Sequence, residues 1–405
     1  MREDILDNRK SAEAGQIQWV IEQHFGELAE IIGIGQVDQF TRAHAHLEGI
    51  QIGGDAALCY ARSLTVEFDE VELLIPATIA AVELGDSSDL ATIGSLLKNQ
   101  DPEVRNACRI GLRFANIGRQ SAGLESLLDP KDLECSASFA DAFAFHRRKL
   151  ELKLQDFFEH ESVYVQEYSF EAAGRASGTR VQDAFQNGIR SNSPRVREAA
   201  YRAACRSGLS QLLTTACRTK ANEAKCVESI SYFGLLSQPN DWQLLQKLLK
   251  EPATTVAAMS AIGKCGWVKL VPWLFDYLDS EEFCEPAALA FERITGLTVP
   301  RGEPREPPED LDEDEKDFWV TTGLPETEII REWWQENSGV FDEQHRYQEG
   351  HCVSKNPLPV IANELSPRVA LDVYLRERAL NHKNTPDWEL ETWPRYWQNP
   401  GWAFS

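Results

Sequence analysis

The histidines offer the first chemistry to test in this sequence, because imidazole is the commonest metal ligand among side chains. His44 and His46 stand two residues apart in the stretch Arg42–Ile50. On a helix, side chains at this spacing point about 200° apart, so the two rings cannot share a metal ion unless the helix breaks. We therefore expect His46 to hydrogen-bond across a helix junction, and we predict no metal site here.

A second set of candidate ligands comprises His345, His351 and Cys352. A structural zinc site needs ligands that converge from a turn and about four ligands in all, and this spacing offers neither. Gly33-Ile34-Gly35 is preceded by no predicted strand and followed by no GK[ST], so it is not a phosphate loop. The sequence also has no GxSxG motif. We predict no catalytic residue, no metal ligand and no cofactor.

An acidic residue and an arginine recur in a more regular context. Asp101 and Arg105 flank a Pro-x-Val motif, and the same Pro, Val and Arg offsets return at residues 194–197. We expect the aspartate of the turn and the arginine of the following helix to hydrogen-bond across adjacent repeats, as a polar ladder. A role in ligand binding would require exposure on an inner surface, which the sequence leaves open.

These residues belong to a helix–turn–helix unit that spans residues 85–118. Apolar residues recur at helical spacing over 89–98 and again over 103–115, with Asp101 placed to cap the second helix and Pro102 at its first position. Such a pair buries one face only when another pair stacks on it. Degraded copies follow through residue 296, and the positions that define the repeat are Asp101, Pro102, Val104, Arg105, Pro194, Val196, Arg197 and Pro252.

The motif DPxVRxAxxxxL resembles the second-helix signature of HEAT repeats. This resemblance implies an all-α fold, an α-α superhelix of stacked antiparallel helix pairs. We predict an N-terminal helical cap over residues 1–70 and the repeat array over 71–298. A Pro-rich acidic linker should follow at 299–317, with a Trp-rich extension at 318–405. That extension should dock on its own repeats or on a partner, as a lid or as a separate module.

The net charge of the chain limits the classes of partner that it can bind. The formal net charge is −23, whereas phosphate binding needs a basic surface, so nucleic acid and anionic membrane are excluded as main partners. The N-terminus has no apolar leader segment, and no apolar run is long enough to span a membrane. We expect a cytoplasmic protein whose partner is another protein, of basic character.

Two further segments resemble a family of HEAT-repeat proteins of Gram-negative bacteria that are commonly encoded beside type VI secretion components. The first is the AHLDGL-like stretch at Arg42–Ile50, and the second is a WW…RYxxG segment. The matching positions are His46, Gly49, Trp333, Trp334, Arg346, Tyr347 and Gly350. The resemblance implies an accessory role in that secretion system.

The repeats and the resemblance together predict a non-enzymatic scaffold or adaptor that holds or delivers a secretion effector. One alternative is an immunity protein that neutralises a cognate toxin, since an acidic surface suits a basic target. A less favoured alternative is a HEAT-fold enzyme that acts on DNA or attaches pigments. The DNA version needs a basic groove, which the net charge disfavours.

Overall fold

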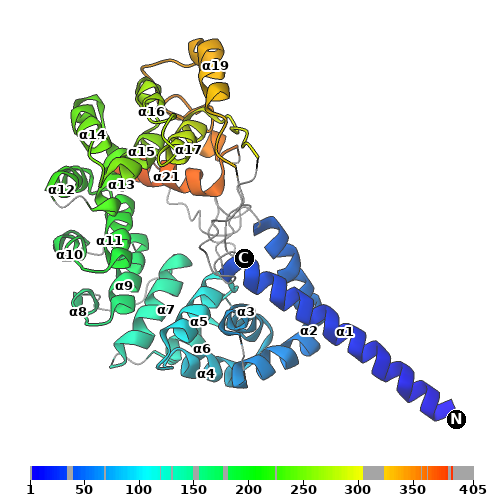
Figure 1. Cartoon of the computed structure of the whole chain (residues 1–405). Coiled ribbons are helices and arrows are strands. Elements are labelled where there is room, and N and C mark those ends of the chain that lie inside the picture. The colour runs from blue at the N-terminus through cyan, green and yellow to red at the C-terminus, as the bar shows by residue number, and fades with distance from the viewer. Residues whose placement is uncertain are drawn as a thin grey trace, which may run out of the picture. The chain divides into compact units, whose positions relative to one another are not determined.

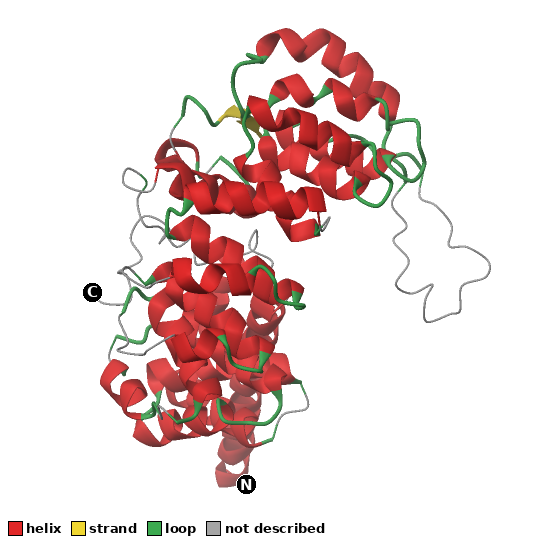
Figure 2. Ribbon diagram, turned by 90° about the vertical axis from the view of Figure 1, so that its left-hand side faces the viewer, coloured by secondary structure: helices red, strands yellow, loops and turns green. Residues whose placement is uncertain are grey.

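The fold is all-α, which confirms the class predicted from the repeats. The computed structural model describes residues 2–33, 40–67, 70–118, 120–128, 131–148, 155–176, 181–223, 226–303, 323–356, 358–362, 364–381 and 385. Within these ranges nearly all regular structure is helical, and the sole sheet is a two-stranded hairpin (Figure 2). None of the described helices is long and apolar enough to cross a membrane.

The contacts divide the chain into two compact units. Unit 1 comprises residues 1–209 and 381–405, and unit 2 comprises residues 210–380. Most of the predicted linker at 299–317 lies outside the described residues, as do Trp319, Trp388, Trp393, Trp397 and Trp402. The described part of the predicted extension up to residue 380 belongs to unit 2, so it packs with α-helices of the same unit.

Unit 1 is built from helices of uneven length. In chain order they are α1 (Arg2–Gly33), α2 (Phe40–Val66), η2 (Val71–Leu73), α3 (Leu74–Leu84), α4 (Ser87–Leu96), α5 (Pro102–Phe114), α6 (Ser121–Ser126), α7 (Leu133–Phe145), α8 (Gln155–Phe158), α9 (Val163–Arg175), α10 (Val181–Gly188) and α11 (Pro194–Arg206).

Alternate helices of unit 1 form a row. α3 packs against α5, α5 against α7, α7 against α9 and α9 against α11, while the short helices α4, α8 and α10 lie against the flanks of this row (Figure 1). This is the contact pattern that stacked helical hairpins produce, because each hairpin buries its apolar face against the next. A continuous core of buried side chains runs from Ile21 on α1 to Phe143 on α7.

Unit 2 repeats the pattern and adds the hairpin. Its helices are α12 (Ser210–Glu223), α13 (Val227–Leu236), η3 (Pro239–Asp241), α14 (Trp242–Leu249), α15 (Thr255–Cys265), η4 (Val268–Leu270), α16 (Pro272–Phe275), α17 (Cys284–Thr295), α19 (Thr327–Asn337), η5 (Ser338–Val340), α20 (Leu358–Ile361) and α21 (Pro367–Asn381), whose last residue belongs to unit 1. The strands β1 (Tyr347–Gln348) and β2 (His351–Cys352) pair antiparallel. α13 packs against α15, and α15 against α17.

The repeat positions near the turns act where the helices begin. Asp101 accepts a hydrogen bond from the backbone N–H of Glu103 at 2.8 Å, and Pro102 is the first residue of α5. Pro194 occupies the same position on α11, and Pro252 lies in the turn before α15. Val104 and Val196 are both buried at the first turn of their helices. The proline fixes the first turn, and the valine anchors it to the core.

Close helix contacts in unit 2 depend on residues without side-chain bulk. A methyl group added at Gly234 on α13 would lie 2.6 Å from the Cα atom of Ala261 on α15. The corresponding methyl group at Gly263 would lie 3.2 Å from the Cα atom of Ala290 on α17. Contacts between carbon atoms are favourable at about 3.5–4.0 Å, so the first glycine is required and the second is only preferred.

We predict that Gly234→Ala lowers the free energy of unfolding of unit 2 by about 1–2 kcal/mol, because the overlap with Ala261 outweighs the better helix propensity of alanine. Gly263→Ala is the matched control and should change stability by less than about 1 kcal/mol, since its smaller overlap is offset by the same propensity gain. Urea denaturation followed by circular dichroism measures both. Equal stability losses in the two variants would contradict this account of the helix contacts.

Candidate functional site

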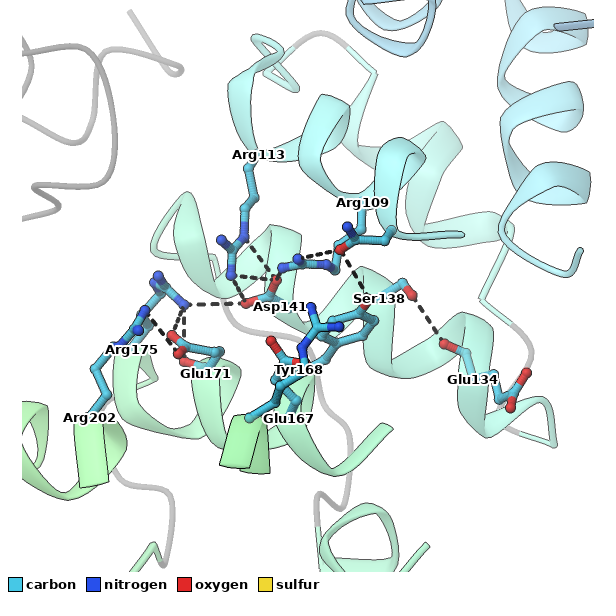
Figure 3. A network of polar contacts seen from close by, with 12 residues as sticks. Arg109, Arg113, Glu134, Ser138, Asp141, Glu167, Tyr168, Glu171, Arg175 and Arg202 are labelled. Atoms are coloured by element: carbon cyan, nitrogen blue, oxygen red, sulfur yellow. Dashed lines mark hydrogen bonds and ion pairs between the residues drawn. The ribbon is translucent and has the colours of Figure 1, made fainter. Parts of the chain in front are cut away.

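A buried carboxylate organises the middle of unit 1. Asp141 on α7 is fully buried and accepts hydrogen bonds from Arg113 at 2.8 and 2.9 Å and from Arg175 at 3.3 Å. Arg109 Nη1 donates to the same carboxylate. Figure 3 shows the arginines converging on Asp141 from α5 and α9. One aspartate thus joins three consecutive members of the helix row.

The electrostatics of this cluster keep Asp141 ionised. Burial alone would raise the pKa of the carboxyl group, but the charges of Arg113, Arg109 and Arg175 hold that pKa well below its usual range. A buried charge is tolerated only when it is paired and hydrogen-bonded, and here both carboxylate oxygens have charged donors. The cluster is therefore stable only as a complete set.

The ion pairs continue along α9 to the next helix. Arg175 also donates to Glu171 at 2.7 Å, and Arg202 on α11 lies 3.3 Å from the other oxygen of Glu171 (Figure 3). The guanidinium groups of Arg113 and Arg175 each lie 5.3 Å from the centroid of the Phe145 ring. We call the set Arg109, Arg113, Asp141, Glu171, Arg175 and Arg202 the arginine cluster.

Asn106 on α5 connects this cluster to the surface. Its Oδ1 accepts hydrogen bonds from Arg109 Nη2 at 2.7 Å and from the Tyr168 hydroxyl at 3.2 Å, while the Arg109 guanidinium lies 4.1 Å from the centroid of the Tyr168 ring. Since arginine can only donate, the amide oxygen must face Arg109, and the Asn106 Nδ2 group faces the other way. Asn106 thus presents a fixed donor on its far side.

Asn106 also lines a cavity of about 260 Å³, which we call the unit 1 pocket. η2 and α3 contribute Val71, Glu72 and Ile75; α5 contributes Pro102, Glu103, Asn106, Ala107 and Ile110; α9 and α11 contribute Tyr164 and Arg195. The pocket is smaller than a usual drug-sized site of about 300–1,000 Å³. It offers room for one side chain or one small molecule.

The residues that α9 and α11 contribute to the pocket form an arginine and tyrosine pair. The Arg195 guanidinium lies 5.2 Å from the centroid of the Tyr164 ring, and Arg195 Nε lies 3.1 Å from a carboxylate oxygen of Glu167. Burial raises the pKa of Glu167, and the nearby Arg109 and Arg195 oppose that rise. The pocket therefore combines a positioned cation and an aromatic ring with exposed carboxylates at Glu72 and Glu103.

The repeat arginines lie close to this region, but with other partners than the expected turn aspartate. Arg105 donates to the carbonyl oxygens of Asn99 and Gln100 in the turn before its own helix, and pairs with Glu134 on α7 at 3.1 Å. Arg197 donates to the carbonyls of Ser191 and Asn192 at 2.9 and 3.0 Å. Asp101 is occupied by capping α5. The expected Asp–Arg ladder is replaced by arginine–carbonyl bonds within each turn.

The histidine motif near the N-terminus joins the first two helices. His46 Nδ1 on α2 lies 3.1 Å from His24 Nδ1 on α1, so one ring donates to the other, as expected for a hydrogen bond across a helix junction. Gly49 makes room for this pair, because a side chain there would overlap the His24 ring. Burial, followed by the neighbouring His24, lowers the pKa of His46. His44 pairs instead with Glu48 at 3.3 Å.

The second motif secures the hairpin of unit 2. Arg346 is buried and donates to the carbonyl oxygens of Leu235 and Cys265, at 3.2 Å each, and to that of Ser237. Its guanidinium lies 4.8 Å from the centroid of the Trp267 ring. These carbonyls belong to the C-terminal ends of α13 and α15, which lack partners within their own helices. Arg346 therefore ties two helix ends together.

The remaining motif residues surround this contact. Trp333 and Trp334 on α19 lie 5.8 and 6.0 Å, between ring centroids, from Phe291 on α17. Gly350 adopts φ +82° in the β1–β2 turn, where a side chain would be strained. The Tyr347 N–H donates to the Gly266 carbonyl at 2.7 Å. His345 and His351 pair with Asp342 and Glu364, at 3.2 and 3.1 Å.

Sequence reasoning did not single out the arginine cluster or the pocket, although one signal was available. α7 reads LECSASFADAFAF, a run of small and apolar residues with a lone aspartate in its second half. An acidic residue at the centre of so apolar a helix must be paired when it is buried. Its partners come from helices 28 to 34 residues away, which no local pattern reveals.

We predict that Asp141→Asn lowers the free energy of unfolding of unit 1 by about 3–5 kcal/mol at pH 7, because buried arginines lose their counter-charge. The folded pKa of Asp141 lies below its unfolded value of about 3.9, so its contribution is complete above that pH and is lost as the pH falls further. The difference between the proteins should persist at about pH 5 and shrink below about pH 4.

The control for this measurement is Asp132→Asn, because Asp132 caps α7 and asparagine caps equally well. That variant should stay within about 0.5 kcal/mol of the wild type at each pH. Urea unfolding at several pH values measures both variants. An Asp141→Asn protein as stable as the Asp132→Asn protein would show that the cluster is not a linked set.

We predict that Arg346→Lys lowers the free energy of unfolding of unit 2 by about 2–3 kcal/mol, since an ammonium group cannot reach carbonyls on two helix ends while stacking on Trp267. Arg331→Lys serves as the control, because Arg331 pairs with Asp279, whose side chain is 77% exposed, and such pairs contribute about 0–1 kcal/mol. Thermal unfolding measures both. Similar losses in the two variants would refute the role assigned to Arg346.

No protein-family model matches the chain, and no curated protein matches it significantly.

Proposed function

We propose that this protein is a non-enzymatic scaffold that binds another protein, and that the unit 1 pocket is its binding site. The observation that carries the proposal is the Arg195–Tyr164 pair at the pocket wall, ordered by Glu167. Tyrosine and arginine are enriched among the residues that dominate interface energetics. An arginine already stacked and paired loses less conformational entropy on binding.

The arginine cluster supports this assignment because it fixes the helices that carry the pocket. Asn106 forms part of the pocket wall and is held by Arg109 and Tyr168, so the pocket rests on helices fixed to one another by buried ion pairs. A binding surface that is ordered before its partner arrives spends less of the interaction energy on ordering. This arrangement favours recognition of a defined partner over adaptation to many.

The likeness of the two motifs to the Gram-negative HEAT-repeat family suggests the cellular process in which the protein acts. We propose a cytoplasmic accessory role in type VI secretion, in which the protein holds or delivers an effector. An immunity protein is the second candidate, favoured by the net charge of −23, which suits a basic toxin. Co-expression with the candidate toxin separates the two, because immunity requires rescue of growth, whereas an adaptor affects export.

We predict that affinity purification from the source organism recovers a protein that depends on the pocket wall. The baits are the wild type, the Tyr164→Ala/Arg195→Ala variant and the Arg190→Ala variant, whose changed residue is exposed on unit 1 outside the pocket. Mass spectrometry should show at least about tenfold less partner on the double variant, the loss that about 1.4 kcal/mol of binding energy produces. Arg190→Ala should retain the partner.

An identical set of proteins on all baits would contradict the proposed site. Recovery of secretion components or effectors would support the adaptor role, and their absence while the system is expressed would count against it. Circular dichroism of each bait establishes that the variants are folded.

A further inference from the structure

The side chains around the unit 1 pocket differ in solvent exposure. Glu72, Glu103 and Arg195 are exposed at its mouth, whereas Ile75 and Ala107 are buried. Along the chain each acidic residue precedes an apolar one by three or four residues, so each wall runs from a carboxylate to an apolar surface within about one helical turn. The accessible lining of the pocket is thus mostly polar, and its apolar residues contribute the smaller part.

The charged groups at the mouth are available to a ligand. Within the described part of the chain, the carboxylates of Glu72 and Glu103 form no hydrogen bond or ion pair. Arg195 uses its Nε toward Glu167, which leaves both terminal nitrogens of the guanidinium to donate. Asn106 directs its Nδ2 away from Arg109 and has no other acceptor among the described residues. The mouth therefore offers two acceptors and two donors.

We propose that the unit 1 pocket binds an α-amino acid unit with a free ammonium group. The ammonium group pairs with Glu72 and Glu103, and the adjacent carbonyl or carboxylate oxygen accepts from Arg195 and Asn106. A ligand of this kind matches the charges of both signs at the mouth. The amino-terminal residue of a protein carries this chemistry, and so does a free amino acid.

Two other occupants fit the pocket less well. The side chain of an internal lysine would place its ammonium group at the mouth of the pocket. It would bring no acceptor, so Arg195 would face a second cation without a hydrogen-bond partner from the ligand. A simple anion would use Arg195 and Asn106 but would face the carboxylates of Glu72 and Glu103. The free amino terminus is the occupant that satisfies each group.

This assignment rests on the proposed function, because it names the chemistry by which the same pocket recognises its partner. The probes are peptides X-Gly-Gly with X as Ala, Val, Leu, Met or Phe, each with a free or an acetylated amino terminus, and free leucine. Calorimetric titration of the full chain measures binding up to about 5 mM ligand. At least one free-amine peptide should bind, and its acetylation should weaken binding at least about tenfold.

The matched variants change the same number of charges in unit 1. Glu72→Gln/Glu103→Gln should weaken binding of the free-amine peptide at least about tenfold and abolish the preference for it over the acetylated form. Glu125→Gln/Glu159→Gln, at exposed positions outside the pocket, should change binding less than about twofold. Binding of free leucine as tightly as the peptide identifies a free amino acid as the ligand, whereas a peptide preference identifies a protein terminus.

Three results overturn the assignment: no free-amine peptide binds, the acetylated peptides bind equally well, or the two double variants lose the same affinity. An acetylated peptide with an internal lysine that binds more tightly would assign the pocket to a lysine side chain instead. If the Tyr164→Ala/Arg195→Ala bait loses its partner while any of these results holds, the proposed function stands and only the ligand is wrong.

Discussion

The structure of unit 1 depends on a buried negative charge that must be paired. Asp141 is fully buried on α7, and its carboxylate is stabilised only because Arg109 and Arg113 arrive from α5 and Arg175 from α9. Stacked hairpins held by apolar contacts alone can slide, because hydrophobic burial is not directional. Charge-assisted hydrogen bonds are directional, so the cluster fixes the register of neighbouring helices.

This fixed register positions the polar side chains that line the pocket. Asn106 is hydrogen-bonded to Arg109 and Tyr168, and Arg195 forms an ion pair with Glu167, one turn before Glu171 on the same helix. Asn106 at the pocket is thus one hydrogen bond away from the buried Arg109. A binding site usually requires supporting contacts behind the groups that touch the ligand, and here the stacking of the repeats supplies them.

The sequence predicted the parts of the fold that local physics controls. The Pro-x-Val-Arg turns, the capping by Asp101 and the helices near residues 327–337 and 367–381 follow from patterns of a few residues. The pocket could not be predicted in this way, because its lining comes from η2, α3, α5, α9 and α11. Which residues of distant repeats meet depends on how tightly successive hairpins pack, and in unit 1 contacts such as Gly111 on α5 against Thr78 on α3 set that distance.

The arginines of the repeat show why a pattern predicted the position but not the bond. The last carbonyls of a helix lack partners, and a guanidinium group has several donors in one plane, so an arginine one turn into the next helix can reach back to them. Arg105 and Arg197 reach back in the same way, but to carbonyls of the turn that precedes their own helix. Arg346, the residue before β1, bonds the last carbonyls of two helix ends at once, from more than 80 residues away in sequence. Arginine–carbonyl hydrogen bonds thus close the turns of unit 1 and hold the terminal hairpin of unit 2, so the repeat motif and the RYxxG segment both supply donors to carbonyls that helix hydrogen bonds leave without a partner.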